Sequence, residues 1–370
     1  MKIAVLGNGL VGNVIAKDLA EMHNVSVFDS NRNNFGENSK SISYHEFDLI
    51  NNDYKIFADF DLIVLAIPGS IAFGILKKLI SLKKNIVDIS FFPEKAKELH
   101  KLALENDVSV VVDCGVAPGL CNMFLGYHAS NSQTSNSKVE SYKCFVGGLP
   151  FERKSPWEYK APFSPTDVLE EYTRPVYIRE NGIDKVVEAM SGIEQIDIDS
   201  IGTLDAFYTD GLRSLLDSFP NIPNLVEKTL RYPGYIQKIK FLKEAGFLNT
   251  EQIEINGIKV SPFELTSKLL IDDWRLTDEM EFTAMRVEIE TKEDKFIYNL
   301  FDNRDVITGY SSMARTTGFT ANAVVDLFAN NKISEKGIIF PENIGANQNY
   351  LKDIYDYLEE RNIIIEVEQK

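Results

Sequence analysis

The glycine motif near the start of the chain constrains the fold more than any other stretch. A short apolar run, Lys2–Leu6, leads into it, and the motif has G-x-G-x-x-G spacing. A stretch with apolar residues at helical intervals follows, and then a second apolar run, Val25–Phe28, which ends in Asp29. The order strand, glycine turn, helix, strand, acid predicts a dinucleotide-binding α/β unit. The glycines of the motif are Gly7, Gly9 and Gly12.

Each glycine has a separate predicted role. Gly7 permits a tight turn after the strand, Gly9 lets the backbone approach a pyrophosphate, and Gly12 lets the helix pack close to the strand. Leu10 and Val11 begin the helix, whose first N–H groups and partial positive charge favour phosphate. We therefore predict that residues 7–12 bind the cofactor.

Asp29 bears on which cofactor is bound. An acid at the end of the second strand can accept hydrogen bonds from the ribose 2′-hydroxyl, and it repels a 2′-phosphate. Asp29 therefore favours NAD over NADP. Arg32 argues the other way, because a nearby arginine can accommodate the phosphate.

The alternation of strands and helices continues to Asp113. Six apolar runs with short helical crossovers predict an N-terminal Rossmann fold with a six-stranded parallel sheet. Ligands bind at the carboxyl ends of such strands. The predicted strands are 2–6, 25–28, 43–47, 61–66, 85–89 and 109–112, and the further cofactor candidates at their ends are Asp48, Leu49, Ala66, Pro68 and Ser90. Of these candidates, Asp48 could instead cap a turn, and Pro68 could instead be only part of a turn.

Composition excludes several classes of function. The formal net charge of −16 disfavours nucleic acid and anionic membranes as partners. No stretch approaches the roughly 20 apolar residues of a membrane span. The initial apolar run is too short for a secretion signal, so we expect a cytoplasmic protein with reduced cysteines. The three cysteines and four histidines form no metal-ligand spacing, so we expect no metal.

Beyond Asp113 the patterning becomes mixed. We predict a Rossmann domain over 1–117, a substrate-binding and dimerisation α+β domain over 118–320, and a C-terminal segment, 321–370, that packs back on the Rossmann domain. Within the second domain, 253–260 reads as one strand, and alternation around 285–289 suggests a sheet face that pairs two copies into a homodimer.

Seven blocks of sequence carry a resemblance to a known family. They are VDISFFPE (87–94), DCGVAPGLCN (113–122), VGGLP (146–150), SPTDVLEEYTRP (164–175), TDGLRSLL (209–216), TLRYPG (229–234) and SSMARTTGFTA (311–321). In their order these blocks resemble the saccharopine dehydrogenase (glutamate-forming) and lysine 6-dehydrogenase family, over residues 1 to about 345. Within that family the chain is most similar to lysine 6-dehydrogenase, because Val146 replaces a cysteine that is common in saccharopine reductases.

The resemblance implies NAD-dependent oxidation of the ε-amine of L-lysine to 2-aminoadipate 6-semialdehyde. It supports Asp113 as the base or as the partner of the substrate cation, with a turn cap as the alternative role. Arg231 is our first candidate for binding the substrate carboxylate, and a structural ion pair is the alternative. Further candidates for binding the substrate are Gly147, Gly148, Tyr172, Arg174 and Arg213.

Three other functions stay open at this point. A saccharopine dehydrogenase (glutamate-forming) and a carboxynorspermidine dehydrogenase share the implied architecture. A non-catalytic NAD-binding protein would keep the glycine motif and not depend on the arginines of the second domain.

Overall fold

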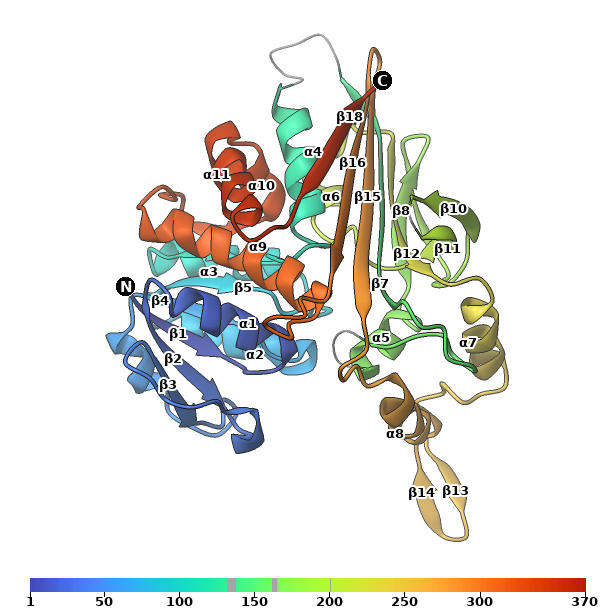
Figure 1. The fold of residues 1–370 in the computed structure, drawn as a ribbon, viewed down its shortest axis with the longest axis horizontal. Helices are drawn as coiled ribbons and strands as arrows, with labels where there is room; N and C mark the ends of the chain where they lie inside the picture. Colours follow the sequence, from blue (N-terminus) through green and yellow to red (C-terminus); the bar gives the residue numbers. More distant parts are fainter. Residues whose placement is uncertain (132–137, 162–164, 200) are drawn as a thin grey trace. The chain divides into compact units, whose positions relative to one another are not determined.

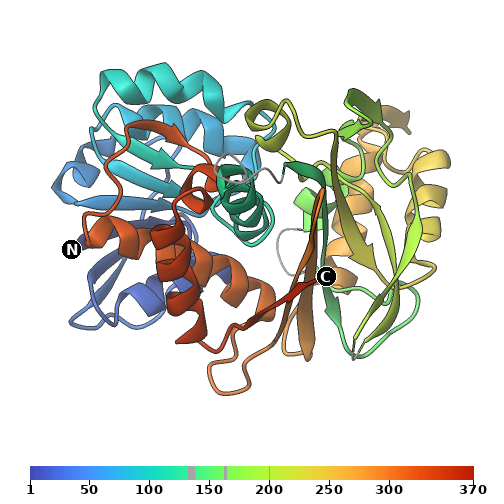
Figure 2. The ribbon, with the colours of Figure 1, turned by 90° about the horizontal axis from the view of Figure 1, so that it is seen from above.

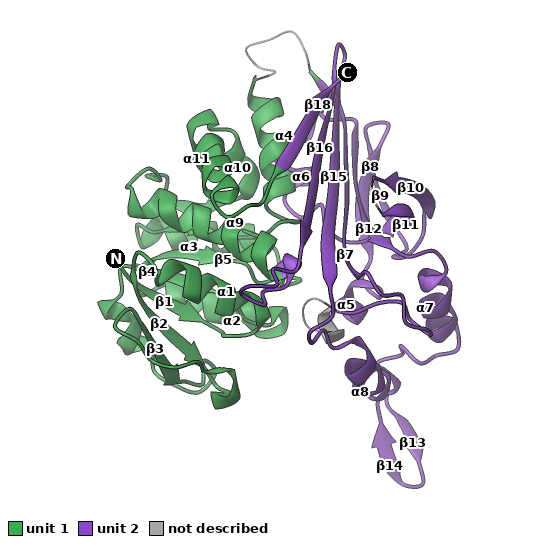
Figure 3. Cartoon of the chain, viewed as in Figure 1, with its two compact units in different colours: residues 1–138, 314–364 green, residues 139–313, 365–370 purple. Residues whose placement is uncertain are grey.

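The chain divides into two compact units. The structure is a computed structural model that describes residues 1–131, 138–161, 165–199 and 201–370. Unit 1 comprises 1–138 and 314–364, and unit 2 comprises 139–313 and 365–370 (Figure 3). These bounds differ from the predicted ones: unit 1 extends past residue 117 because it includes helix α4 (Leu120–Asn131), and it resumes at 314 rather than 321.

A parallel sheet of seven strands forms the centre of unit 1. All six predicted strands are present, and the order across the sheet is β17-β6-β5-β4-β1-β2-β3. The seventh strand, β17, comes from the C-terminal segment and has only three residues, too few for an apolar pattern to reveal it. The strands are β1 (Lys2–Leu6), β2 (Asn24–Asp29), β3 (Ile42–Glu46), β4 (Leu62–Leu65), β5 (Asn85–Asp88), β6 (Ser109–Val111) and β17 (Gly337–Ile339).

The strand order places a topological switch point beside β1. β1 pairs with β2 on one side and with β4 on the other, so the chain winds in opposite directions from it. Ligands of open α/β sheets bind at the carboxyl ends of the strands at such a point. Every side chain of β4 is buried, as expected for a strand covered on both faces. The crossover helices are α1 (Leu10–Leu19), α2 (Gly69–Ile80) and α3 (His100–Glu105), with 3₁₀ turns at Arg32–Asn34, Tyr54–Asp59 and Ala96–Leu99.

The C-terminal segment returns to unit 1 as three helices, α9 (Ser312–Ala329), α10 (Pro341–Gly345) and α11 (Gln348–Glu359). Figures 1 and 2 show the orange helix α9 alongside the blue N-terminal part of the chain. A Cβ at Gly318 of α9 would lie 3.3 Å from Ile15 of α1, so the two helices pack closely. The last strand departs from the prediction: β18 (Ile365–Gln369) pairs with β16 in unit 2.

A buried polar cluster fixes α9 and α11 to α1. Asp18, 9% exposed, accepts hydrogen bonds from Asn322 Nδ2, Tyr357 Oη and Arg361 Nε, each at 2.7 Å. The Arg361 guanidinium also stacks on the Tyr357 ring at 3.5 Å. One carboxylate therefore connects two segments that are far apart in the sequence.

Unit 2 contains a nine-stranded mixed sheet. Its main path is β10-β11-β12-β7-β15-β16-β18, and β8 pairs with β12 and β9. The central pair, β12 and β7, is parallel, and the neighbouring pairs are antiparallel. The strands are β7 (Val139–Pro150), β8 (Val176–Glu180), β9 (Ile183–Val187), β10 (Glu194–Ile198), β11 (Gly202–Tyr208), β12 (Asn224–Arg231), β15 (Glu281–Thr291) and β16 (Lys295–Asn303), besides β18.

Four helices and a hairpin complete the described part of unit 2. The stretch predicted as one strand is a hairpin, β13 (Ile253–Ile255) and β14 (Ile258–Val260), which projects beyond α8 in Figure 1. Asn256 and Gly257, both with positive φ, form its turn, because an Asn-Gly pair suits a two-residue hairpin loop. The helices are α5 (Pro165–Glu171), α6 (Leu215–Ser218), α7 (Tyr235–Glu244) and α8 (Pro262–Trp274).

We predict that Asp18→Ala lowers the free energy of unfolding by about 3 kcal/mol, because Asn322, Tyr357 and Arg361 together lose the carboxylate that accepts their hydrogen bonds. Thermal unfolding followed by circular dichroism measures the effect. Glu21→Ala, which removes an exposed acid close to the same helix, is the control and leaves the melting temperature unchanged. Equal melting temperatures for the two variants would show that the cluster does not stabilise unit 1.

Candidate functional site

The glycine loop and the end of β4 are in direct contact. Gly7 has a φ of +95°, and a Cβ there would lie 2.1 Å from the Ala66 carbonyl oxygen. A Cβ at Gly12 would lie 2.2 Å from the Gly7 carbonyl oxygen. Neither position accepts a side chain, because backbone atoms already occupy the space. The packing of the protein therefore accounts for both glycines.

Packing within the protein does not explain why residue 9 is a glycine. A Cβ at Gly9 would meet no atom within 4 Å, and its φ of −69° is open to any residue. Gly9 is also the N-cap of α1, and no side chain of the described residues caps that helix. Leu10, the first helical residue, is 49% exposed. An open cradle at an uncapped helix N-terminus fits the pyrophosphate of a dinucleotide.

Asp29 is held at the end of β2 by two backbone donors. Its Oδ2 accepts from the Asn8 N–H at 2.7 Å and its Oδ1 from the Asn31 N–H at 2.8 Å. The carboxylate is thus fixed beside the second residue of the glycine motif. Arg32 instead forms an exposed ion pair with Glu46.

The other predicted cofactor residues fall into two groups. Ala66, Pro68 and Ser90 lie at the carboxyl ends of β4 and β5, and Ser90 Oγ accepts from the Ile67 N–H at 3.4 Å. Pro68 is the N-cap of α2. Asp48 and Leu49 lie at the end of β3.

Asp48 caps a turn, as its alternative reading stated. It accepts hydrogen bonds from Asn51 Nδ2 and the Ile50 N–H, which lower the pKa of its carboxyl. The Leu49 side chain belongs to the hydrophobic core and is 8% exposed. Any contact of these two residues with a cofactor therefore depends on backbone atoms or on the outer face of Asp48.

Asp113 has an uncommon backbone conformation at the carboxyl end of β6. Its φ is +52°, in the left-handed region, and the residue is only 4% exposed. The adjacent N–H of Cys114 donates to the Asp88 carbonyl oxygen at 3.0 Å, which ties this turn to β5. A buried non-glycine residue in this region costs free energy and is enriched at functional sites. Unit 1 thus brings Asp113, Ser90, Ala66 and the glycine loop to one edge of the sheet.

Burial keeps the thiol beside Asp113 inert. Cys114 is fully buried, and burial together with the Asp88 and Asp113 carboxylates raises the pKa of its thiol far above the usual range. A thiol that stays protonated is a poor nucleophile. Of this group, Asp113 is therefore the candidate for proton transfer.

In unit 2, Arg231 lies in a buried aromatic cluster at the end of β12. It is 4% exposed, and its guanidinium lies 4.4 Å above the ring of Tyr159 and 5.7 Å from that of Tyr235. Its Nη1 donates to the Leu230 carbonyl oxygen at 2.8 Å and its Nη2 to Tyr159 Oη at 3.3 Å. Its Nε has no hydrogen-bond partner among the described residues.

The charge states in this cluster follow from burial. Burial raises the pKa values of Tyr159, Tyr172 and Tyr235, so their hydroxyls stay neutral. Burial alone would lower the pKa of Arg231, but the tyrosine hydroxyls and Glu171 outweigh it and the guanidinium stays charged. Tyr172, a predicted substrate residue, joins the cluster through a 3.4 Å contact between its hydroxyl and that of Tyr235.

The other arginine candidates lie in different surroundings. Arg174 forms an ion pair with Glu170 at 2.6 Å on the last turn of α5. Arg213, with a φ of +53°, lies on the loop after β11. Glu227 of β12 holds that loop through Thr209 Oγ1 at 2.8 Å and the Gly211 N–H at 3.1 Å. Arg174 thus matches a structural ion pair more closely than a ligand site.

Gly147 and Gly148 lie inside β7 rather than in a loop, opposite Ala284 and Thr283 of β15. A Cβ at Gly147 would lie 2.5 Å from the Leu230 carbonyl oxygen. Packing of β7 against β12 accounts for this glycine, and it places β7 next to the residue that precedes Arg231. Ser164, part of a block that carried the family resemblance, lies outside the described residues.

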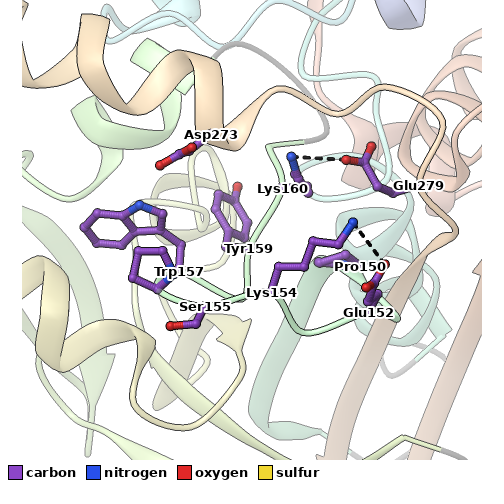
Figure 4. Close-up of a pocket in the computed structure, with 10 residues that line it drawn as sticks. Pro150, Glu152, Lys154, Ser155, Trp157, Tyr159, Lys160, Asp273 and Glu279 are labelled. Atoms are coloured by element: carbon purple, nitrogen blue, oxygen red, sulfur yellow. Dashed lines mark ion pairs between the residues drawn. The ribbon is translucent and has the colours of Figure 1, made fainter.

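A cavity of about 180 Å³ lies beside the cluster (Figure 4). Tyr159 lines it, together with Lys160, Glu279 and Trp157. Sequence reasoning singled out neither Tyr159 nor Trp274, which packs against Tyr159 with ring centroids 5.2 Å apart. Nothing in their sequence spacing marks them, because the cluster assembles from four separate segments of the chain.

The described residues contain no group of three or more His, Cys, Asp or Glu side chains that could hold a metal. No helix in the same part of the chain is long and apolar enough to cross a membrane.

We predict opposite outcomes for alanine at two glycines of the loop. Gly9→Ala leaves the melting temperature unchanged but weakens the binding of a pyridine dinucleotide about tenfold, because the new methyl group enters the cradle. Gly7→Ala destabilises unit 1 by about 2 kcal/mol or more, because its Cβ meets the Ala66 carbonyl. Calorimetric titration and thermal unfolding measure the two effects. Unchanged dinucleotide affinity in Gly9→Ala would exclude this cradle as the binding site.

Comparison with known proteins finds relatives that are named alpha-aminoadipic semialdehyde synthase and saccharopine dehydrogenase. It is 27% identical over 295 residues to the mitochondrial alpha-aminoadipic semialdehyde synthase of Bos taurus, which covers 74% of this chain but 31% of that protein. The chain thus spans about a third of the length of those relatives. It is 22% identical to the saccharopine dehydrogenase [NADP(+), L-glutamate-forming] of Pyricularia oryzae, over 82% of this chain and 85% of that one.

The fold has a counterpart among solved structures. The apo saccharopine dehydrogenase (L-Glu forming) from Saccharomyces cerevisiae superposes with a TM-score of 0.79 at 18% identity, covering 100% of this chain and 99% of the other. At this identity the likeness establishes the fold. The family model described as Saccharopine dehydrogenase C-terminal domain matches residues 115–364, more than half of the chain. The chain therefore belongs to the saccharopine dehydrogenase family.

Proposed function

We propose that the protein is an NAD-dependent oxidoreductase that oxidatively deaminates L-lysine at its ε-amine, giving 2-aminoadipate 6-semialdehyde. The observation that carries the proposal is Asp113: a buried acid in the left-handed conformation at the edge of the sheet that bears the open glycine cradle. An amine dehydrogenase needs an acid–base group beside its hydride acceptor, and Asp113 is suited to that role.

The chemistry follows from the residues of unit 1. When bound in the cradle, the nicotinamide cofactor supplies the hydride acceptor. Asp113 takes a proton from the substrate ammonium, because only the neutral amine can release hydride from its carbon. Loss of hydride leaves an imine, water adds to its carbon, and ammonia departs as the aldehyde forms. The absence of a side chain at Gly9 keeps the space beside the helix N-terminus open for the cofactor.

Arg231 of unit 2 is assigned to the substrate's carboxylate. Its described hydrogen bonds go to neutral oxygens, and its Nε has no partner among the described residues. A buried donor without an acceptor costs about 1–3 kcal/mol, and a bound carboxylate would remove that cost. Arg213, on the loop held by Glu227, is the second candidate for the same task.

NAD is proposed ahead of NADP. The Asp29 carboxylate is fixed where it favours a free 2′-hydroxyl, and Arg32 is paired with Glu46. The names of the fungal relatives, which specify NADP(+), argue for the other cofactor. Asp29 is therefore the residue on which the choice depends.

Saccharopine is the second candidate substrate, because the fungal relatives are named saccharopine dehydrogenases. The reacting bond is the same one, with a glutamate rather than ammonia as the leaving amine. Nothing among the described residues favours carboxynorspermidine. A non-catalytic NAD-binding protein would turn over neither lysine nor saccharopine.

We predict NAD reduction with L-lysine and little or none with saccharopine, followed by absorbance of the reduced nicotinamide. Asp113→Asn lowers kcat by about 10² to 10⁴-fold, because the base is lost. Asp107→Asn is a matched control: Asp107 has a φ of +56° at the other end of β6 and is exposed. If the protein turns over saccharopine and not L-lysine, saccharopine is the substrate. Full activity of the Asp113→Asn variant would exclude Asp113 as the base.

We also predict that Asp29→Ala narrows the preference for NAD over NADP by about tenfold, because repulsion of the 2′-phosphate is lost. The ratio of kcat/KM for the two cofactors measures the preference. Arg32→Ala serves as the control and leaves the ratio within twofold. A wild-type preference for NADP would contradict the cofactor assignment.

A further inference from the structure

We propose that Tyr159 is a positioning residue that fixes the guanidinium of Arg231 for carboxylate recognition, and that the Lys160–Glu279 ion pair holds Tyr159 in place. The inference rests on the proposed function, in which Arg231 binds the carboxylate of the substrate. Tyr159 touches no reacting atom and acts through Arg231.

Tyr159 contacts Arg231 in two independent ways. Its ring lies under the guanidinium at 4.4 Å, and its hydroxyl accepts from Arg231 Nη2 at 3.3 Å. With Arg231 Nη1 bonded to the Leu230 carbonyl, the plane of the guanidinium is defined by a stacked ring and two acceptors. A carboxylate is bound best by an arginine whose fork is already oriented, because less side-chain entropy is then lost on binding.

The neutrality of the hydroxyl matters as much as its position. An acid in place of Tyr159 would form an ion pair with Arg231 and compete with an incoming carboxylate. The pKa of Tyr159 is raised by burial, so the hydroxyl orients the cation without neutralising it. Tyr159 is 3% exposed, and Tyr235 and Trp274 pack against its ring.

A local clamp fixes the segment that carries Tyr159. Lys160 Nζ lies 3.1 Å from Glu279 Oε1 and donates to the Arg275 carbonyl oxygen at 3.3 Å. The Ala161 N–H donates to the Trp274 carbonyl oxygen at 2.7 Å. Figure 4 shows this ion pair at the edge of the cavity that Tyr159 lines.

Glu279 keeps its charge over the whole physiological range. Burial alone would raise its pKa, but hydrogen bonds from Thr277 and Lys160 lower the pKa to about 2. Both partners of the ion pair are 18% exposed, so solvent screens the pair only in part.

The experiment compares Tyr159→Phe, Tyr159→Leu and the control Tyr232→Phe. Phenylalanine keeps the ring under Arg231 and loses the acceptor, whereas leucine loses both. Tyr232→Phe also removes a buried hydroxyl of unit 2, but that hydroxyl bonds to the Pro150 carbonyl oxygen at 2.9 Å and not to Arg231. The readouts are KM for L-lysine, KM for NAD, kcat, and the calorimetric dissociation constant of glutarate, which needs no turnover.

We expect Tyr159→Phe to raise KM for lysine and the glutarate dissociation constant about fivefold, and Tyr159→Leu about fiftyfold, because one and then both contacts are lost. We expect kcat and KM for NAD to stay within twofold of the wild-type values in both variants. Glu279→Gln also raises KM for lysine and the glutarate dissociation constant, as Tyr159→Phe does. The control leaves all values unchanged.

Wild-type affinity for glutarate in Tyr159→Leu would overturn the positioning role and leave the proposed function intact. Absence of turnover with L-lysine and saccharopine would instead remove the proposed function. In that case only the dissociation constants of glutarate test whether Tyr159 positions Arg231. If the wild-type protein does not bind glutarate, the positioning role of Tyr159 is overturned too.

Discussion

The close contact between Gly7 and Ala66 is the constraint on which the fold of unit 1 depends. No side chain fits at Gly7, because the Ala66 carbonyl occupies the position of its Cβ. That contact brings the turn after β1 against the end of β4, and Gly12 then lets α1 start beside it. Between these two packed positions Gly9 stays open, because a Cβ there would meet no atom within 4 Å. Asp29 and Asp113 are placed by the same sheet, at the ends of strands on either side of this contact.

Strand β12 has the corresponding role in unit 2. It lies between β11 and β7, and it carries Glu227, Thr229 and Arg231 at alternate positions, which point to one face of a strand. Glu227 holds the loop that bears Arg213, and Arg231 reaches the tyrosine cluster. Burying an arginine among aromatic rings is costly unless its donors are satisfied. The hydroxyl of Tyr159 and the Leu230 carbonyl satisfy part of that demand, and the remaining donor makes the cluster suited to an anionic ligand.

The sequence predicted unit 1 more completely than unit 2, for physical reasons. Strands buried on both faces are continuous apolar runs, so β1, β4 and β5 were evident, whereas three-residue β17 has no pattern to detect. The stretch 253–260 was predicted as one strand because its apolar residues outweighed the Asn-Gly turn at 256–257. β18 was assigned to the wrong unit, since pairing with β16 depends on tertiary contacts that local patterning does not record. Arg231 was singled out within a sequence block, and Tyr235 lies four residues after it, but Tyr159 and Trp274 reach it from separate segments that no spacing links to it.

In the proposed reaction, hydride leaves the ε-carbon of lysine. L-Lysine that carries two deuterium atoms on that carbon tests it most directly, with mass spectrometry of the reduced nicotinamide and of the aldehyde after turnover. We expect one deuterium in the reduced cofactor, one in the aldehyde, and a slower reaction if hydride transfer limits the rate. Turnover without deuterium in the cofactor, or transfer only from lysine labelled at the α-carbon, would contradict it.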